Sequence, residues 1–437
     1  MERTGMFARI AAWSDKLRGS LFFVPMMCVV FAIVMGEAML VVDSQVTEIH
    51  PRLTATVDSA RTVLTTVAGA TLTFAGIAFS VSLLLISLAS SQYSPRVVHG
   101  MFRDPFNKRV MGLVVGTFTY CLVVLRAVRS SLEGVGEAIV PSVSILLAVV
   151  LGIASILSII AFINHAAHSM DVSMILHRVT HEALSQASSA WPEPSQDDDQ
   201  GESDGPVPDL PPQAVAVRFD RYGWVENIDY ERLLGELPAG TWLRLETVAG
   251  RYAVQNSPLC YVFPEPADGL AARLRSCVTI GQSRTLQQDV VYGVRQLADV
   301  ALKAMSPGIN DPTTAHDAMS HLGVVLADLL HRDAPARRLE GVDGRLVLVP
   351  FATTPDELIG VAFDEVRIAS QSQPTMLIHL LVVLKDVVES LPRTSRLVAK
   401  NALREQATLI RAIVEEADLM DADKERVRQV HARLFGS

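Results

Sequence analysis

Residues 62–95 read TVLTTVAGATLTFAGIAFSVSLLLISLASSQYSP and contain no charged side chain. Within this stretch the small and hydroxylated residues recur at steps of four and three, which places them on one face of a helix. The face consists of Thr62, Thr66, Gly69, Thr73, Gly76 and Ser80, and it continues after Leu83 with Ser87 and Ser91. The stretch therefore predicts a membrane-crossing helix with one small, weakly polar side.

Four apolar runs dominate the first 165 residues, and they extend over residues 21–42, 62–89, 110–125 and 138–163. Each run reaches or approaches the roughly 20 residues that a helix needs to cross the hydrocarbon core of a bilayer. A mean hydropathy of +0.30 and a charged fraction of 19% are also too apolar for an ordinary soluble chain of 437 residues. We predict four transmembrane helices followed by a soluble section.

The basic residues of the short loops predict the orientation. Lys and Arg are concentrated on the cytoplasmic side of membrane proteins. The segment before the first run and the loop after the second run hold four basic residues each, whereas the other two loops hold two each. Both termini are therefore expected in the cytoplasm, in a bacterial inner membrane. Four cysteines without a C-x-x-C pair agree with a reducing compartment.

The composition changes along the chain and divides it into four expected regions. They are a transmembrane domain over 1–187, with an interfacial amino-terminal helix and a juxtamembrane helix; an acidic, Pro-rich linker over 188–212; a small β module over 213–266; and a mainly helical domain over 267–437. Strands first and helices after indicate an α+β arrangement. The expected fold is thus a membrane α-helical bundle plus a cytoplasmic α+β domain.

Two roles stay open for the small-residue face of the second apolar run. Small residues let helices pack closely within or between subunits, which is the commoner use, and hydroxyls can line a passive pore. Only Glu37 interrupts the four runs, so an ion-coupled carrier is disfavoured. In the pore interpretation Leu83 forms a constriction, and the pathway is lined by Thr66, Gly69, Thr73, Gly76, Ser80 and Ser87.

The loop SSQYSPRVVHGMFRDPFNKR, residues 90–109, follows this helix and is rich in basic residues. One interpretation is a cytoplasmic mouth of the pathway, formed by Ser94, Pro95, Arg96 and Arg103. The alternative is an orientation signal that contacts lipid headgroups.

The stretch RTLQQDVVYGVRQLADVALKAMSPGINDPTTAHDAMSHL, residues 284–322, is the most distinctive part of the soluble section. It predicts two helices with a corner between them, where Asp311 caps the second helix and Pro312 occupies its first turn. A polar corner of Arg295, Asp299, Asn310 and Asp311 could hold an anion at that helix start. A purely architectural corner explains the same residues.

His177 and His181 share one helical face at a spacing that zinc sites use, but the glutamate of an H-E-x-x-H site is missing. Exposed histidines near a membrane need no ligand, so neither a metal site nor a cofactor is assigned. No nucleotide-binding loop or nucleophile elbow is present, and the net charge of −9 argues against nucleic acid. No enzyme activity is expected.

Two stretches together resemble a known family: the loop at 90–109, with its S-P-R element, and DVVYGVRQLADVALKAMSPGINDPTTA, with its S-P-G-I-N-D-P element. The chain resembles the bacterial predicted membrane proteins of domain of unknown function 2254, from the first run through the last helices. The resemblance implies several amino-terminal membrane helices and a cytoplasmic domain. It supplies no activity, substrate or catalytic residue.

Our first hypothesis is a homo-oligomeric, channel-like protein of the bacterial inner membrane that passes an ion or a small solute and carries a cytoplasmic regulatory domain. Its partners are the lipid bilayer and further copies of itself. The alternative is a membrane-anchored scaffold or sensor that does not conduct and binds a partner or ligand. A third class is a metal- or pH-responsive regulator that uses the histidine helix.

Overall fold

A computed structural model describes residues 23–45, 56–92, 105–128, 140–168, 171–193, 210–265, 268–350, 353–392 and 396–436. The chain forms two compact units, Met1–Asp171 and Val172–Ser437. Each unit is described by itself below.

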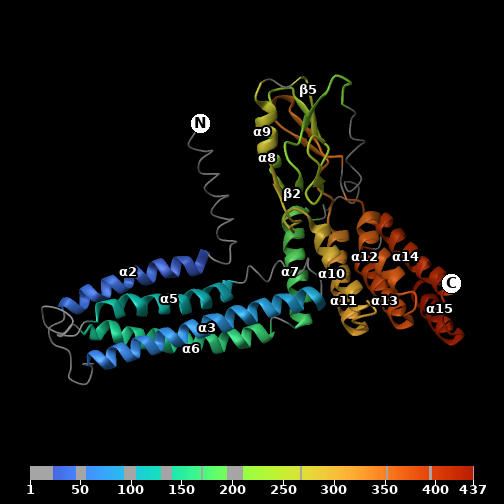
Figure 1. The fold of residues 1–437 in the computed structure, drawn as a ribbon. Coiled ribbons are helices and arrows are strands. Elements are labelled where there is room, and N and C mark those ends of the chain that lie inside the picture. The colour runs from blue at the N-terminus through green and yellow to red at the C-terminus, as the bar shows by residue number, and fades with distance from the viewer. Residues whose placement is uncertain are drawn as a thin grey trace. The chain divides into compact units, whose positions relative to one another are not determined.

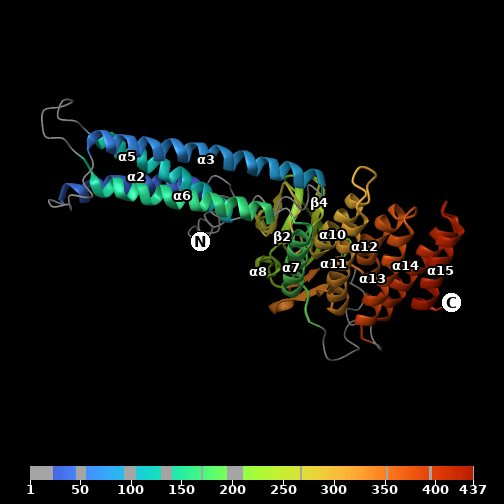
Figure 2. The same cartoon turned by 90° about the horizontal axis from the view of Figure 1, so that it is seen from below.

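The described part of the first unit contains four long apolar helices, which run side by side (Figures 1 and 2). They are α2 (Phe23–Gln45), α3 (Val57–Gln92), α5 (Pro105–Ala127) and α6 (Ser142–His168). All four are long and apolar enough to cross a membrane, which confirms the predicted bundle. Helix α3 has 36 residues and is therefore about 54 Å long, well beyond the ~30 Å of the hydrocarbon core.

Glycines let the helices of this bundle approach one another closely. A Cβ atom added to Gly36 of α2 would lie 2.7 Å from a side chain of α5, and one added to Gly112 of α5 would lie 2.7 Å from a side chain of α2. At Gly152 of α6 the distance to a side chain of α3 would be 3.0 Å. These three positions have no space for a larger residue without movement of a neighbour.

Polar contacts tie the helices together near the ends of α2 and α5 and the start of α6. The carboxylate of Asp43 accepts hydrogen bonds from the backbone N–H groups of Val143 and Ser144, at 2.9 and 3.0 Å. It therefore caps α6 from a neighbouring helix. Glu37, the acidic residue within the first apolar run, pairs with Arg126 of α5.

The second unit begins with α7 (Val172–Ala190) and continues into a β module. Its five-stranded sheet has the order β1-β5-β3-β8-β7 and its three-stranded sheet the order β4-β2-β6. Among the described strand pairs, only β3–β8 is parallel. The strands are β1 (Val215–Arg218), β2 (Gly223–Ile228), β3 (Trp242–Leu245), β4 (Tyr252–Ala253), β5 (Pro258–Phe263), β6 (Val278–Gly281), β7 (Arg338–Glu340) and β8 (Leu346–Leu348).

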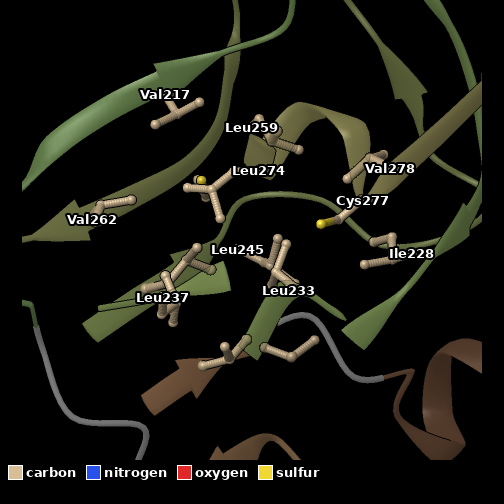
Figure 3. Close-up of a cluster of buried hydrophobic side chains, with 14 of the residues drawn as sticks. Val217, Ile228, Leu233, Leu237, Leu245, Leu259, Val262, Leu274, Cys277 and Val278 are labelled. Carbon is tan, nitrogen blue, oxygen red and sulfur yellow. The ribbon is translucent and has the colours of Figure 1, made fainter. Parts of the chain in front are cut away.

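The core of the module lies between the two sheets and two short helices, α8 (Tyr230–Glu236) and α9 (Leu270–Ser276). Figure 3 shows Leu233 of α8, Leu274 of α9 and strand residues such as Leu245 directed into one cluster. Two cysteines are buried in it, and burial raises the pKa of Cys260 to about 12 and that of Cys277 to about 11. Both thiols are therefore inert packing groups at neutral pH.

Six helices complete the second unit as far as its residues are described: α10 (Val290–Ala304), α11 (Pro312–His331), α12 (Pro355–Ala369), α13 (Pro374–Ser390), α14 (Leu397–Glu416) and α15 (Asp421–Phe435). Helix α10 packs on α11 and α12, α11 on α13, and α13 on α14 and α15; Figure 2 shows them in this succession. Side chains of Asp289, Asp311 and Thr354 cap three of these helices, as N-cap chemistry favours.

The structure divides the chain at other positions than the sequence patterns suggested. Helix α7 was expected in the transmembrane domain, up to residue 187, but it packs on α10 and α11 in the second unit. The β module extends beyond residue 266, because β6 pairs with β2 and β8 pairs with β3. Such long-range pairing leaves no local signal in the sequence. The interfacial amino-terminal helix and most of the acidic linker lie outside the described residues.

Candidate functional site

The small-residue face of α3 is turned away from the rest of the described bundle. Every member of the predicted pore lining is exposed: Thr66, Gly69, Thr73, Gly76, Ser80, Leu83 and Ser87. Leu83, the predicted constriction, is 51% exposed. The structure therefore keeps these residues together on one surface.

The opposite side of α3 forms the interior contact of the bundle with α5 and α6. Its residues are each 6% exposed or less: Ala60, Leu64, Ala68, Thr71 and Ala78. Since successive residues of a helix are rotated by about 100°, this side lies nearly diametrically opposite the small-residue face. The protomer thus uses one side of α3 for its own core and leaves the hydroxylated side outward.

Two glycines on this outward face differ from the other glycines of the described transmembrane helices in their surroundings. A Cβ atom added to Gly69 or to Gly76 would meet nothing within 4 Å, whereas Gly36, Gly112, Gly116 and Gly152 all have close neighbours. A glycine inside a helix costs about 1 kcal/mol relative to alanine. At Gly112 and Gly152 close helix packing offsets that cost, but no described residue of the same protomer does so at Gly69 and Gly76.

The hydroxyl groups of the face bond to their own helix. The Oγ1 atoms of Thr62 and Thr66 donate to the carbonyls of Asp58 and Thr62, both at 2.7 Å, and Thr73 Oγ1 donates to the carbonyl of Gly69 at 2.9 Å. These bonds engage the hydroxyl hydrogens and leave each oxygen able to accept. The face therefore offers hydrogen-bond acceptors, the property that a cation or a donor group requires.

The interior of the single bundle is filled by side chains. Tyr120 and Phe162 are 0% and 1% exposed, and the Tyr120 hydroxyl donates to the carbonyl of Ser144 at 3.1 Å. Ser155 Oγ donates to Thr117 Oγ1 at 3.0 Å. A pathway lined by the small-residue face would consequently run along the outside of one protomer.

The predicted cytoplasmic mouth, Ser94, Pro95, Arg96 and Arg103, lies outside the described residues. The structure begins again at Pro105, and the first turn of α5 packs against the end of α6. There the ring centroids of Phe106 and His165 are 4.6 Å apart, and Lys108 is 4% exposed.

The predicted polar corner of the soluble section is divided between two local networks. Arg295 donates to Asp299 at 2.9 Å and, through both terminal nitrogens, to Glu365 of α12 at 2.7 and 2.8 Å. Asp311 instead accepts from the N–H of Thr314 at 3.1 Å and from its hydroxyl, bonds that lower the pKa of Asp311. Asn310 is exposed, with a positive φ of 48°. The capping carboxylate occupies the helix start, which favours the architectural interpretation.

His177 and His181 are both exposed on α7. Within the described ranges there is no group of three or more His, Cys, Asp or Glu residues arranged to hold a metal ion. One histidine pair was missed by the sequence patterns because its members lie on different helices: the rings of His316 and His379 stack at 4.4 Å. Burial lowers the pKa of both, and the imidazole of His316 lowers that of His379 further. Burial and the imidazole of His177 likewise lower the pKa of His321.

A second group of residues missed by the sequence patterns joins the β module to α10. Arg284 donates to both carboxylate oxygens of Asp289, at 2.5 and 3.1 Å, and Asp289 is 4% exposed. The guanidinium carbon lies 5.8 Å from the ring centroid of Trp224 and 5.1 Å from that of Tyr292. Burial raises the pKa of Asp289, against the opposing effect of Arg284.

Comparison with known proteins supports the resemblance. A family model described as predicted membrane protein (DUF2254) matches residues 18–386. Uncharacterized proteins of Mycobacterium tuberculosis (strain H37Rv) and Mycobacterium bovis are each 29% identical over 407 residues, covering 91% of this chain and 77% of theirs. No solved structure matches the chain.

Proposed function

The chain belongs to the DUF2254 family of predicted membrane proteins, and we propose that its copies assemble in the bacterial inner membrane as a passive, channel-like oligomer. The small-residue faces of α3 meet around a shared axis. An ion or a small solute passes along that axis, and the Val172–Ser437 unit regulates passage from the cytoplasm.

The exposed pair Gly69 and Gly76 carries this proposal. Glycines in membrane helices commonly allow close approach of another helix, and the described protomer supplies no neighbour within 4 Å of either position. Contact with lipid chains does not require a small, hydroxylated surface, whereas close helix packing does. In the proposed assembly, the α3 helices of two copies cross closely at the glycines. The same contact brings the threonine oxygens of both copies near each other.

The chemistry of the face suits passage of a small hydrated species. Each copy contributes acceptor oxygens from Thr66 and Thr73, which can replace part of a cation's hydration shell. Leu83 lies on the same face, where a ring of leucines would exclude water and close the path. No described charged residue lies on α3 between Arg61 and Gln92, so nothing there supports coupling to a proton or ion gradient.

Replacement of Leu83 by serine is expected to raise the conductance of the full-length protein in planar bilayers by about tenfold or more, because the apolar ring that gates by dewetting is lost. The matched control is Leu157→Ser on α6, where the side chain is 61% exposed but lies away from the face. That variant is expected to conduct like the parent.

Absence of current from both the parent and Leu83→Ser would reject conduction. It would favour the alternative function, a membrane-anchored scaffold or sensor, in which the α3 faces pack dry against each other. The well-packed second unit, with its own module core, is the part that would then bind a partner.

A further inference from the structure

An exposed aromatic tip on the three-stranded sheet has no part in the proposed pathway. We define the aromatic tip as Tyr222, Trp224, Tyr252 and Val254. Tyr222 is 70% exposed, Tyr252 50% and Val254 59%. Large apolar groups that gather at the surface commonly mark an interaction site.

The strand register brings these side chains onto one face. Gly223 pairs with Ala253 and Trp224 with Tyr252 in the antiparallel β2–β4 ladder. Directly opposite residues share a face and alternate residues return to it, so Trp224 and Tyr252 share a face. Tyr222 and Val254 lie one residue beyond the paired strands, where continued alternation directs them to the same face. Sequence separation hides this grouping.

The aromatic tip is held in place before any partner binds. The rings of Trp224 and Tyr252 meet edge to face at 5.3 Å. Behind Trp224, Arg284 fixes the ring through a cation–π contact and is itself paired with Asp289. The flanking loops are tied together by hydrogen bonds between Phe219 and residues 256 and 257, both at 3.0 Å. A preformed site loses little conformational entropy on binding.

Exposed arginines adjoin the aromatic tip along the chain: Arg221 directly precedes Tyr222, and Arg251 directly precedes Tyr252. Arg218, Arg221 and Arg251 lie on the strands and loops that carry it, and all three are exposed. Arg221 makes only a long contact of 3.8 Å with Asp220. The partner should therefore combine an apolar layer with negative charge.

We propose that the aromatic tip binds the surface of a bilayer that contains anionic phospholipids. Tyrosine and tryptophan favour the headgroup layer, where the ring is in an apolar region and its polar end meets water. Arginines near such a surface are attracted by anionic headgroups. The second unit is tethered to the membrane helices by a short connection, because only residues 169–171 separate α6 from α7 in the sequence.

The size of the aromatic tip favours lipid over a protein partner. A stable protein interface buries about 800 Å² on each side. None of the four side chains is more than 70% exposed, and with at most about 250 Å² for a whole side chain they offer less than about 700 Å² together. Partition into a lipid surface has no such minimum, since each side chain contributes independently.

The test uses full-length protein in nanodiscs, with bimane attached at Val254→Cys and spin-labelled headgroup lipid as the quencher. The control label is at Val342→Cys, which is 79% exposed on the turn before β8. The pairings of β5, β3 and β8 place that turn at the opposite end of the five-stranded sheet from Arg218 and Pro258. The unsubstituted parent, labelled in parallel, gives the background from native cysteines.

Quenching at Val254→Cys is expected to exceed quenching at Val342→Cys, and to be stronger in phosphatidylglycerol than in phosphatidylcholine discs. Each arginine contributes about fivefold to binding of an anionic surface. Arg221→Glu with Arg251→Glu removes both positive charges and adds two negative ones, so the pair is expected to lower the docking equilibrium by at least about 25-fold. Tyr222→Ser with Tyr252→Ser is expected to abolish the excess quenching in both lipids.

Equal quenching at the two labels, or quenching unchanged by both pairs of substitutions, would overturn the proposal. Protection of Val254→Cys only by a second copy or by a soluble protein would overturn it as well.

Discussion

Replacing Gly69 and Gly76 together by leucine is expected to dissociate the oligomer into folded monomers. A Cβ at either position meets nothing within 4 Å in the described protomer, so the bundle itself can accept the larger side chains. Between copies, each leucine would separate two closely packed helices at a cost of about 1–3 kcal/mol. Two such sites weaken association by about 30-fold or more. Native mass spectrometry of the protein released from nanodiscs measures the change.

Gly152→Leu is the matched control, because its added Cβ would lie 3.0 Å from a side chain of α3 inside the same bundle. That variant should lower the melting temperature of the transmembrane unit, whereas Gly69→Leu/Gly76→Leu should leave it unchanged. If the double variant remained oligomeric, the two glycines would have no role between copies. If it unfolded like Gly152→Leu, the face would be packed within the protomer.

Asp289→Asn is expected to destabilise the second unit by about 3 kcal/mol, because Arg284 would be left without its charged partner. Breaking a buried ion pair costs about 3–5 kcal/mol, and the lower end applies since Arg284 is 26% exposed. Asparagine is as good an N-cap as aspartate, so the start of α10 is kept. Asp289→Ala should add about 1 kcal/mol through loss of that cap.

Thermal unfolding of the full chain measures the Asp289 effect, which corresponds to a fall of roughly 6–12 °C in a unit of this size. Glu365→Ala is the control: its carboxylate also pairs with an arginine but is 56% exposed, and such pairs contribute about 0.2–1 kcal/mol. Equal shifts in the two variants would show that burial of Asp289 contributes nothing. A large shift also predicts weaker lipid docking, since Arg284 supports Trp224.

Local patterns in the sequence were sufficient for the bundle and for most helices. The uncharged run with a repeating small residue every three or four positions specified α3 and its face, because helix periodicity is a local property. The last four helices could be located in the same way, from their polar faces and from starts such as Thr354-Pro355. Four helices able to cross a membrane confirm that part of the analysis.

The tertiary contacts between residues that are distant in the sequence could not be predicted from it. The direction of the α3 face depends on which side of the helix packs against α5 and α6. The buried side holds residues such as Ala60 and Ala68, which are as small as those of the exposed side, so residue size did not show which side would be buried. The parallel β3–β8 pair joins residues about a hundred positions apart. Trp224 and His379 likewise contact residues that are distant in the sequence, Arg284 and His316. These contacts are fixed by tertiary packing and leave no periodic signal.

Cysteine cross-linking at Thr73 tests the central claim that copies meet along the small-residue face of α3. Thr73 is exposed at the middle of that face, between Gly69 and Gly76, so a thiol there should react with its counterpart in a neighbouring copy through a short bifunctional reagent. In membranes, Thr73→Cys is expected to give a covalent dimer. The parent and Leu157→Cys, on the outward side of α6, are expected to give no covalent dimer. Monomeric Thr73→Cys together with cross-linked Leu157→Cys would place the contact on another helix and contradict the proposed assembly.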